Sequence, residues 1–450
     1  MAETRAVHAE PAAEPSPTRR MVAIVVTFAL LGTLFDGAEI NLVSYPMTYL
    51  ADSLHTSTLH IVSINTYQGL ATIAGGFLFG WLGDTIGRRK TYAMCVFAFG
   101  LGALIGCLAD SLAVFLLARL VAGLGMGGLF GLAFAMFTEC WKTTRRGAMG
   151  GVIQAMFFVG QILTVGVIFA CISGLGHDTG WRTGYAILGA ASIAVSAAAI
   201  RWLPESPRWA AYRRTLPDGE PATGRPGHLE QPERARARTA KAPVADLLRG
   251  SNARMFLTFA ALSTGTFISS NAIGAYLSTF LLKTEHLSLA RTTVIVLIGY
   301  VASIAAYTGT GVVSDLVRRN RAFFGASLVG LVGFTWMLIL VATKHDHVAK
   351  AFWSDQTFWA LLLCAAGFGG FGVLGVWMSE IFPTPIRSTG ANGSYYIGRG
   401  LGAGLFPLAA LALTGTVAMS IAVGVIGPAV CVLISYTAKD RTGRTIGALE

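Results

Sequence analysis

The chain has 450 residues, of which 54% are hydrophobic and only 13% are charged. A soluble domain carries about 25% charged residues, whereas the mean hydropathy of this chain is +0.60. The composition therefore excludes an ordinary soluble domain and indicates a membrane protein. The net charge of +11 has to be explained by where the basic residues lie.

Apolar segments of about 20 residues, the length that crosses a hydrocarbon layer of about 30 Å, recur along the whole chain. Residues 1–20 are polar and predict a short cytoplasmic tail, and no small-residue cleavage site follows the first apolar segment, so we expect that segment to be retained. The segments predict twelve transmembrane helices, at residues 21–44, 61–82, 91–109, 112–137, 148–172, 183–203, 254–282, 292–313, 322–343, 356–378, 391–413 and 416–438.

Lysine and arginine collect on one side of these predicted helices. Arg119 and Arg399 lie inside helices, and the external loops hold only Arg182, Lys283, Arg291, Lys344 and Lys350. Basic residues resist translocation, so the pattern predicts a multi-pass protein of the cytoplasmic (inner) membrane with both termini in the cytoplasm. Topology thus accounts for the positive charge, and we expect no nucleic-acid partner.

Two charged motifs occur twice. Gly80-x3-Asp84-x3-Arg88 recurs as Gly311-x3-Asp315-x3-Arg319, and Glu139-x6-Arg146 recurs as Glu380-x6-Arg387. The copies follow equivalent helices, which predicts two six-helix halves in the same orientation. We therefore expect an N-terminal half at 21–203, a cytoplasmic linker at 204–253, a C-terminal half at 254–438 and a cytoplasmic C-terminal tail at 439–450.

Four segments in this order, GWLGDTIGRRK (80–90), ARLVAGLGMGG (118–128), PESPRW (204–209) and EIFPTPIRSTG (380–390), resemble the signatures of the major facilitator superfamily. Within it, the chain resembles the metabolite (aromatic acid):proton symporters and the sugar porters. The resemblance implies an all-α fold of twelve transmembrane helices in two halves, with a central cavity open alternately to either side. The scattered cysteines have no metal-ligand spacing, and no nucleophile and base form a set. We expect neither an enzyme nor a cofactor.

Four charged residues lie deep in apolar segments, namely Asp36, Glu39, Arg119 and Arg399. A charge facing lipid at the bilayer centre costs about 2.5–3.5 kcal/mol, so these side chains are expected to face protein or water. Asp36 and Glu39 are three residues apart, on one helix face. Close, buried carboxylates disfavour double ionisation, and Arg119 favours the ionised form; a proton on the acid would release the arginine.

We therefore predict that Asp36, Glu39 and Arg119 couple transport to protons. Proton-coupled porters resemble this chain in having an acid in helix 1 that faces an arginine in helix 4, and by position Glu39 is the better match. The sequence does not decide which acid titrates. The alternative is a permanently ionised structural pair.

Arg399 shares one face of the eleventh helix with Asn392 and with Tyr395 or Tyr396. A guanidinium fork suits a carboxylate or a phosphate, and the segment YIGRGLG resembles that of aromatic-acid and organic-anion carriers. The alternative is that Arg399 pairs with an acid or caps the carbonyls of a broken helix. The predicted substrate-binding residues are Arg399, Gln154, Gln161, Asn271, Asn392, Tyr395 and Tyr396.

The repeated loop motifs predict a gate on the cytoplasmic side. Asp84 can accept hydrogen bonds from a basic group or a helix N-terminus of the opposite half, closing that side in the outward-facing state. The alternative is that these charges only set the topology. The predicted gate comprises Gly80, Asp84, Gly87, Arg88, Glu139, Arg146, Glu205, Arg208, Asp315, Arg319, Glu380 and Arg387.

Together these features predict proton-coupled uptake of a small organic anion, such as an aromatic or other carboxylic acid. The expected partners are the substrate, protons and the lipid bilayer, and the expected state is a monomer. PESPRW and Gln154 favour a neutral sugar or polyol symporter as the alternative, although Gly375 stands where sugar porters carry a tryptophan. A second alternative is a transporter-like sensor that binds without translocation.

Overall fold

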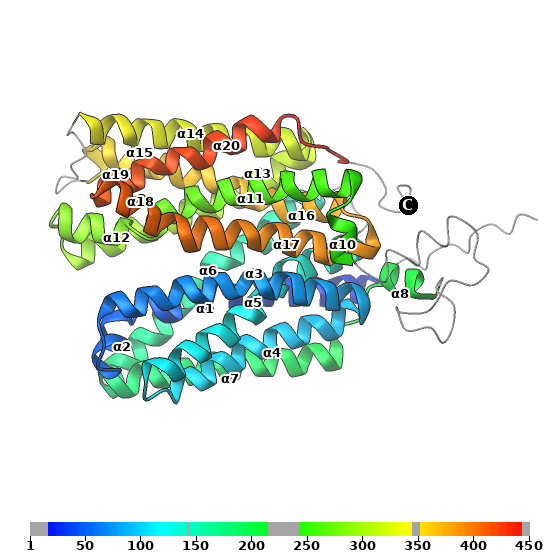
Figure 1. The fold of residues 1–450 in the computed structure, drawn as a ribbon, viewed down its shortest axis with the longest axis horizontal. Helices are drawn as coiled ribbons and strands as arrows, with labels where there is room; N and C mark the ends of the chain where they lie inside the picture. Colours follow the sequence, from blue (N-terminus) through cyan, green and yellow to red (C-terminus); the bar gives the residue numbers. More distant parts are fainter. Residues whose placement is uncertain (1–16, 142–144, 215–242, 344–351, 443–450) are drawn as a thin grey trace, which may run out of the picture.

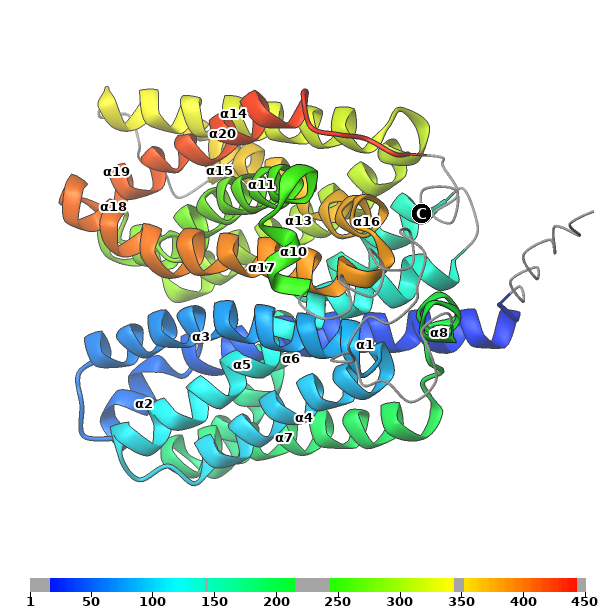
Figure 2. The ribbon, with the colours of Figure 1, turned by 45° about the vertical axis from the view of Figure 1, so that its right-hand side comes forward.

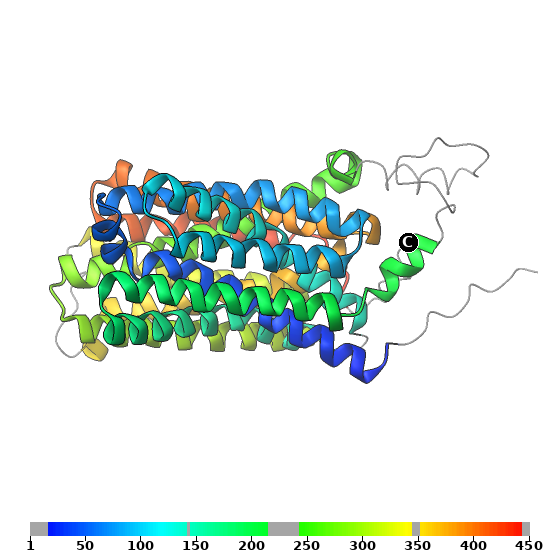
Figure 3. The ribbon, with the colours of Figure 1, turned by 90° about the horizontal axis from the view of Figure 1, so that it is seen from below.

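The structure is a computed structural model that describes residues 17–141, 145–214, 243–343 and 352–442. Within these ranges the chain is helical and contains no strand. Parts of the predicted N-terminal tail, linker and C-terminal tail lie outside the described residues, as do Lys344 and Lys350. The helices run along one common long axis (Figures 1 and 3). They form two bundles that lie side by side (Figure 1).

The first bundle is built from long, uninterrupted helices. These are α1 (Arg19–Ser44), α3 (Thr58–Thr85), α4 (Arg88–Cys107), α5 (Leu112–Cys140), α6 (Arg146–Leu175) and α7 (His177–Trp202), with the short α2 (Met47–Ser53) between α1 and α3. They are separated by short turns, so that neighbours in sequence run in opposite directions.

The second bundle contains helices interrupted by 3₁₀ or π turns. Its elements are α11 (Gly250–Gly274), α12 (Leu277–Thr279), η1 (Phe280–Thr284), α13 (Leu289–Leu316), α14 (Arg319–Ala342), η2 (Phe352–Ser354), α15 (Gln356–Gly367), η3 (Phe368–Gly370), α16 (Phe371–Ile381), η4 (Thr384–Ile386), α17 (Arg387–Arg399), η5 (Gly400–Leu405), α18 (Phe406–Thr414), α19 (Val417–Ala422), η6 (Val423–Val425) and α20 (Ile426–Ser435). Such turns often mark functional hinges.

Eleven helical spans of the described chain are long and apolar enough to cross a membrane. The helix α3, with 28 residues, supplies the twelfth. The predicted all-α fold of twelve transmembrane helices is therefore confirmed.

Several predicted helix boundaries were wrong. The helix predicted at 183–203 begins at His177. The predicted helix 391–413 begins earlier, at Arg387, and its regular α-helix is interrupted at Gly400. Its first turn, Arg387–Gly390, is buried. The sequence does not predict this turn because its residues are polar, and carboxylates of the first bundle satisfy them by hydrogen bonds and an ion pair. The break follows from the glycines of the segment GLGAGL.

Helices of both bundles meet at the interface. α3 packs along α17, and α6 packs along α13, while α16 and α17 also contact α5. α4 and α7 lie on the outer side of the first bundle, away from the second (Figure 2). The short helices α8 (Pro207–Arg214) and α10 (Pro243–Leu247) lie at one end of the molecule, near the last described residues (Figure 1). The sequence predicts that this end faces the cytoplasm.

Candidate functional site

Glu39 and Arg119 form an ion pair inside the first bundle. Nη1 of Arg119 lies 2.5 Å from Oε1 of Glu39. The guanidinium carbon lies 5.6 Å from the ring centre of Phe115 and 5.2 Å from that of Tyr185, within the range of cation–π attraction. Within the described residues, Nε and Nη2 of Arg119 have no hydrogen-bond partner. The arginine is thus held by one carboxylate and two aromatic rings.

Asp36 and Arg399 form a second ion pair, which joins the two bundles. Nη1 of Arg399, on α17, lies 3.0 Å from Oδ1 and 3.3 Å from Oδ2 of Asp36, on α1. The guanidinium carbon also lies 5.7 Å from the ring centre of Tyr396. This is the arrangement of the alternative in which Arg399 pairs with an acid. The acids on one face of α1 therefore have different partners, one in each bundle.

The two ion pairs are closed off from solvent. Asp36 and Arg399 are 5% exposed, Glu39 is 3% exposed and Arg119 is fully buried. Separating a buried pair without replacing the lost partner costs about 3–5 kcal/mol. In this conformation the site is occluded, and any solute that binds an arginine here has to compete with a carboxylate of the protein itself.

Aromatic side chains from both bundles close the middle of the interface. The ring of Phe130, on α5, stacks on that of Tyr395, on α17, with centroids 3.5 Å apart and planes at 8°. Phe158, on α6, lies 5.3 Å from Tyr300 and 5.2 Å from Tyr307 on α13. Ring contacts of this kind are worth about 0.5–1.5 kcal/mol each beyond the area they bury, so they stabilise the closed interface next to Arg399.

Two residues of α17 that the sequence predicts to bind substrate contact α5 in this conformation. Nδ2 of Asn392 donates to the carbonyl of Gly128 at 2.9 Å, and Oδ1 accepts from the amide of Gly131 at 2.6 Å. The hydroxyl of Tyr396 accepts from the amide of Phe130 at 3.4 Å. Asn392 and Tyr396 thus bridge the bundles in this conformation.

The predicted amides outside α17 differ in their surroundings. Gln154 and Gln161 are buried on α6, and within the described residues Oε1 of Gln154 has no hydrogen-bond partner. Tyr395 lies beside the side chain of Gln154. Asn271 donates to the carbonyl of Phe267 in its own helix at 3.0 Å. Gln154 therefore keeps an unused buried oxygen beside Tyr395, whereas Asn271 is bonded locally.

Asp84 caps the N-terminus of α17 across the interface. Its Oδ1 accepts from the amide of Ser388 at 3.1 Å, and its Oδ2 accepts from the amide of Thr389 at 2.8 Å and from the Thr389 hydroxyl at 2.6 Å. Arg88 lies 3.1 Å from the same carboxylate. A carboxylate at a helix N-terminus satisfies unpaired amides and interacts favourably with the helix dipole.

The repeat copy of this motif makes the reciprocal contact. Asp315, in the second bundle, accepts from the amides of Gly147 and Ala148 at the start of α6, both at 2.8 Å. Arg319 lies 2.7 Å from Asp315. Each bundle thus caps one helix of the other, and we call Asp84, Asp315 and the helix starts that they cap the latch.

Further buried charges reinforce the latch from both bundles. Glu139 pairs with Arg387 across the interface, lies 3.6 Å from Arg88 and accepts from the hydroxyl of Ser206. Its repeat copy Glu380 binds Arg319 through Nε and Nη2, both at 3.1 Å, and lies 3.8 Å from Arg146. The ion pair that Glu380 forms across the interface with Arg146 is thus longer than the equivalent pair of Glu139 with Arg387.

The remaining predicted gate residues shape the loop between α3 and α4. Gly87 has φ of +114°, a conformation that favours glycine, and a Cβ on Gly80 would lie 2.7 Å from Cα of Thr389. Glu205 accepts from the amide of Arg88 at 2.9 Å and so caps α4. Arg208, on α8, lies within electrostatic range of Arg146.

Two capping residues at this end of the molecule are not predicted from the sequence. Asp440 accepts from the amide of Asn320 at 3.2 Å, and Thr442 accepts from the amide of Arg319 at 3.0 Å, so together they cap α14 as Glu205 caps α4. The signal was present, since Asp440 follows the twelfth helix as Glu205 follows the sixth. The repeat does not predict Asp440, because the residues around it do not match those around Glu205.

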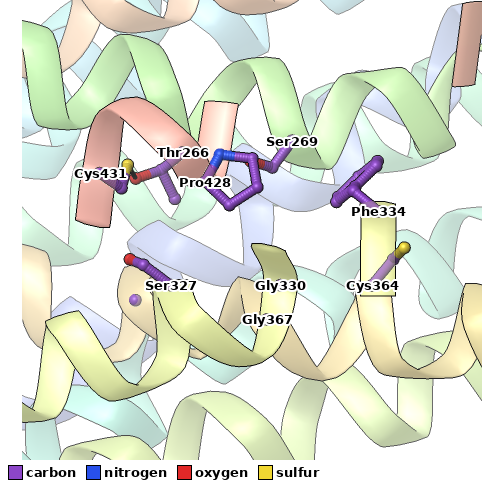
Figure 4. A pocket seen from close by; sticks show the side chains of 10 residues that line it. Thr266, Ser269, Ser327, Gly330, Phe334, Cys364, Gly367, Pro428 and Cys431 are labelled. Carbon is purple, nitrogen blue, oxygen red and sulfur yellow. Dashed lines mark hydrogen bonds between the residues drawn. The ribbon is translucent and has the colours of Figure 1, made fainter. Parts of the chain in front are cut away.

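The small cavity in Figure 4 belongs to the second bundle and not to the ion pairs. Thr266, Ser269, Ser327 and Cys431 supply its polar lining, from α11, α14 and α20 (Figure 4). Its volume of about 10 Å³ is near the smallest space that holds one water molecule. A transported solute would not fit there.

Known proteins resemble this chain over most of its length. Residues 28–407 match the model of the Major Facilitator Superfamily. A putative niacin/nicotinamide transporter of Bacillus subtilis is 24% identical over 396 residues, covering 86% of each chain. A cis,cis-muconate transport protein of Acinetobacter baylyi is 25% identical over 389 residues, covering 85% of this chain and 86% of its own.

The solved structures agree on the fold. The proton:xylose symporter XylE superposes with a TM-score of 0.76 at 19% identity, covering 95% of this chain and 98% of its own. The paired bundles and the matched family model lead to one conclusion. The chain is a multi-pass membrane transporter, not an enzyme, and belongs to the Major Facilitator Superfamily.

Proposed function

We propose that this protein is a proton-coupled symporter of the cytoplasmic (inner) membrane that takes up a small organic anion, such as an aromatic or other carboxylic acid. The observation that carries the proposal is the presence of two buried arginines, each held by a carboxylate of α1, Arg119 inside the first bundle and Arg399 at the interface of the bundles. An arginine whose counter-ion is an exchangeable carboxylate suits an anionic substrate.

Proton coupling rests on the acids of α1. The two candidates to carry the proton are Glu39, with Arg119 as its partner, and Asp36, with Arg399 as its partner. Protonation neutralises the acid and frees the arginine, whereas loss of the proton restores the pair. This exchange links the charge state of the site to the packing of α1 against its neighbours.

Alternating access requires that one side open while the other is closed. We assign the closed end to the cytoplasmic side, with the latch holding it shut and both termini on that side. Opening it breaks the caps at α6 and α17, so the proposal places the main barrier to the inward-facing state there. One chain contains the whole site, so the proposed unit is a monomer.

Related transporters support the choice of an acid. The relative from Acinetobacter baylyi is a transport protein for cis,cis-muconate, a carboxylate, and it aligns with 85% of this chain. The relative from Bacillus subtilis is a putative transporter of niacin and nicotinamide, of which niacin is an aromatic acid.

The test uses purified protein in vesicles with an imposed pH gradient. Labelled benzoate is expected to accumulate when the outside is acidic and to stop accumulating when a protonophore collapses the gradient. Arg399→Ala is expected to lose benzoate accumulation. Asp52→Asn, an exposed carboxylate of α2, serves as the matched control and should accumulate benzoate normally. Normal accumulation by Arg399→Ala would refute the anion site.

A neutral sugar or polyol is the second candidate substrate. Gln154 favours it, because its buried, unpaired Oε1 suits a hydroxyl donor, and a plastidic glucose transporter of Arabidopsis thaliana is 28% identical over 44% of this chain. Xylose accumulation in the same vesicles, with no benzoate accumulation, would establish this alternative.

The third candidate is a sensor that binds without translocation. It predicts binding of benzoate or xylose to the purified protein without accumulation of either, at any imposed gradient. The vesicle experiment therefore separates all three functions.

A further inference from the structure

We infer that Asp36 occupies, in the empty carrier, the position at Arg399 that the carboxylate of the transported anion takes, so that binding of the anion displaces Asp36 and places one proton on it. The inference rests on the proposed function and assigns the proton linked to anion binding to Asp36. It leaves Glu39 and Arg119 paired while the anion binds.

The geometry at Arg399 is that of an arginine already holding a carboxylate ligand. One nitrogen, Nη1, faces both oxygens of Asp36, at 3.0 and 3.3 Å, and the pair is sealed from solvent. Asp36 belongs to the first bundle and Arg399 to the second. The protein's own carboxylate thus bridges the bundles at the place where a transported anion would do so.

Among the described residues, Arg399 is the cationic group that partners Asp36. α17 presents Arg399 with Tyr395 and Tyr396 to it, and its own helix presents Glu39, whose charge is held by Arg119 of α5. α6, which packs along α1, has no charged residue after Arg146. An anion that binds Arg399 therefore leaves Asp36 without a cationic partner.

A buried carboxylate without a partner is neutralised by a proton because keeping it ionised is too costly. The charges balance. Before binding, the site holds Arg399 positive and Asp36 negative; afterwards it holds Arg399 positive, the anion negative and Asp36 as the neutral acid with a new O–H bond. Anion and proton therefore enter together without changing the net charge of the site.

The same pair explains how the carrier reorients when empty. An unpaired arginine could not be buried at the interface, since it remains charged at any physiological pH. Asp36 supplies the missing negative charge, so the empty carrier closes as the loaded one does. Without Asp36, only the loaded carrier would close.

The first experiment measures benzoate binding to the purified full-length protein in weakly buffered solution. Between about pH 6 and 8 the wild-type affinity is expected to fall with rising pH by up to about tenfold per unit, with one proton taken up per benzoate bound. Asp36→Asn mimics the neutral acid. It is expected to bind benzoate with an affinity independent of pH, without proton uptake.

Two further variants test the assignment. Glu39→Gln combined with Arg119→Gln removes the other pair without leaving an orphan charge and is expected to keep the proton uptake. Asp52→Asn, the exposed control, should behave as wild type. Proton uptake that persists in Asp36→Asn, or that is lost in the double variant, overturns the inference.

Asp36→Glu covers the case in which Asp36→Asn does not fold. It keeps a carboxyl group on a longer arm, so it should retain uptake of one proton but shift the pH at which benzoate affinity changes. An unshifted pH profile overturns the inference. Wild-type protein that binds benzoate without any proton uptake overturns it as well.

Failure of the inference and failure of the proposed function are distinguishable. Gradient-driven benzoate accumulation with unaltered proton linkage in Asp36→Asn leaves the function standing and removes the role of Asp36. Proton uptake that depends on Asp36, without accumulation in vesicles, removes the function and keeps the site. If benzoate, nicotinate and muconate all fail to bind, both are wrong.

Discussion

Glu39 and Arg119 illustrate, for single residues, how this protein tolerates charge in an apolar interior. The carboxylate lies 2.5 Å from the guanidinium, and the rings of Phe115 and Tyr185 flank the arginine. The partners are not equivalent. A glutamate left alone can bind a proton and become neutral, whereas an arginine left alone remains charged.

We therefore expect Glu39→Gln to destabilise the protein more than Arg119→Gln, by up to about 3–5 kcal/mol, because only Glu39→Gln leaves a permanent buried charge. The double variant should recover most of the loss. The stability of Arg119→Gln should rise as the pH falls, because the orphan Glu39 is then neutralised. Thermal unfolding of the purified variants at several pH values measures this.

Asp52→Asn provides the baseline, since Asp52 is exposed. A double variant as unstable as Glu39→Gln would contradict the view that the charge of Arg119 is balanced mainly by Glu39.

Among the helices, α17 is one whose position depends strongly on the other bundle. It starts with polar residues, its first amides are capped by Asp84, and α3 packs along it. The close approach is possible because Gly80 of α3 has no side chain, leaving room for the backbone of Thr389. The helix then ends at Arg399, directly before the π turn of η5.

Gly80→Ala is expected to lower both the thermal stability of the closed state and the rate of uptake. The new methyl group would lie 2.7 Å from Cα of Thr389, and relieving such a clash costs about 1–3 kcal/mol. Gly166→Ala, in α6, is the matched control, because a Cβ there meets nothing within 4 Å. It should be neutral or stabilising by up to about 1 kcal/mol. Equal effects of the two variants would refute the close-contact argument.

The whole molecule consists of two bundles that cap each other's helices at one end. Asp84 caps α17, and Asp315 caps α6, so each bundle contributes one capping carboxylate to the latch. The two caps differ, since Asp84 also accepts from the hydroxyl of Thr389. The helices of the first bundle are uninterrupted, whereas several helices of the second are broken by 3₁₀ or π turns. We therefore expect bending during transport to concentrate in the second bundle.

Asp84→Asn is expected to loosen this end of the molecule. The asparagine keeps one acceptor oxygen but loses the charge, which is worth about 1 kcal/mol at a helix N-terminus; the amides at the start of α17 should exchange with solvent about fivefold faster. Hydrogen exchange of peptides covering Arg387–Ala391 measures the change. Asp315→Asn should instead accelerate exchange at the start of α6, and Asp52→Asn should alter neither. Unchanged exchange in Asp84→Asn would mean that the carboxylate does not hold α17.

The sequence by itself determined the class of fold, its twelve helices and the identity of the buried charges. Length and hydropathy suffice for that, because the bilayer requires about 20 apolar residues per span, and a charge within such a span stands out. The repeated loop motifs also identify Asp84 and Asp315, the two carboxylates of the latch.

Only the tertiary structure decided the partners. Asp36 and Glu39 lie on one face of α1, so periodicity could not tell which acid meets Arg119 and which meets Arg399. It also could not show that Asn392 holds α5 or that Asp440 caps α14. These pairings join residues far apart in the chain, and they depend on how the two bundles pack against each other, which local patterns do not encode.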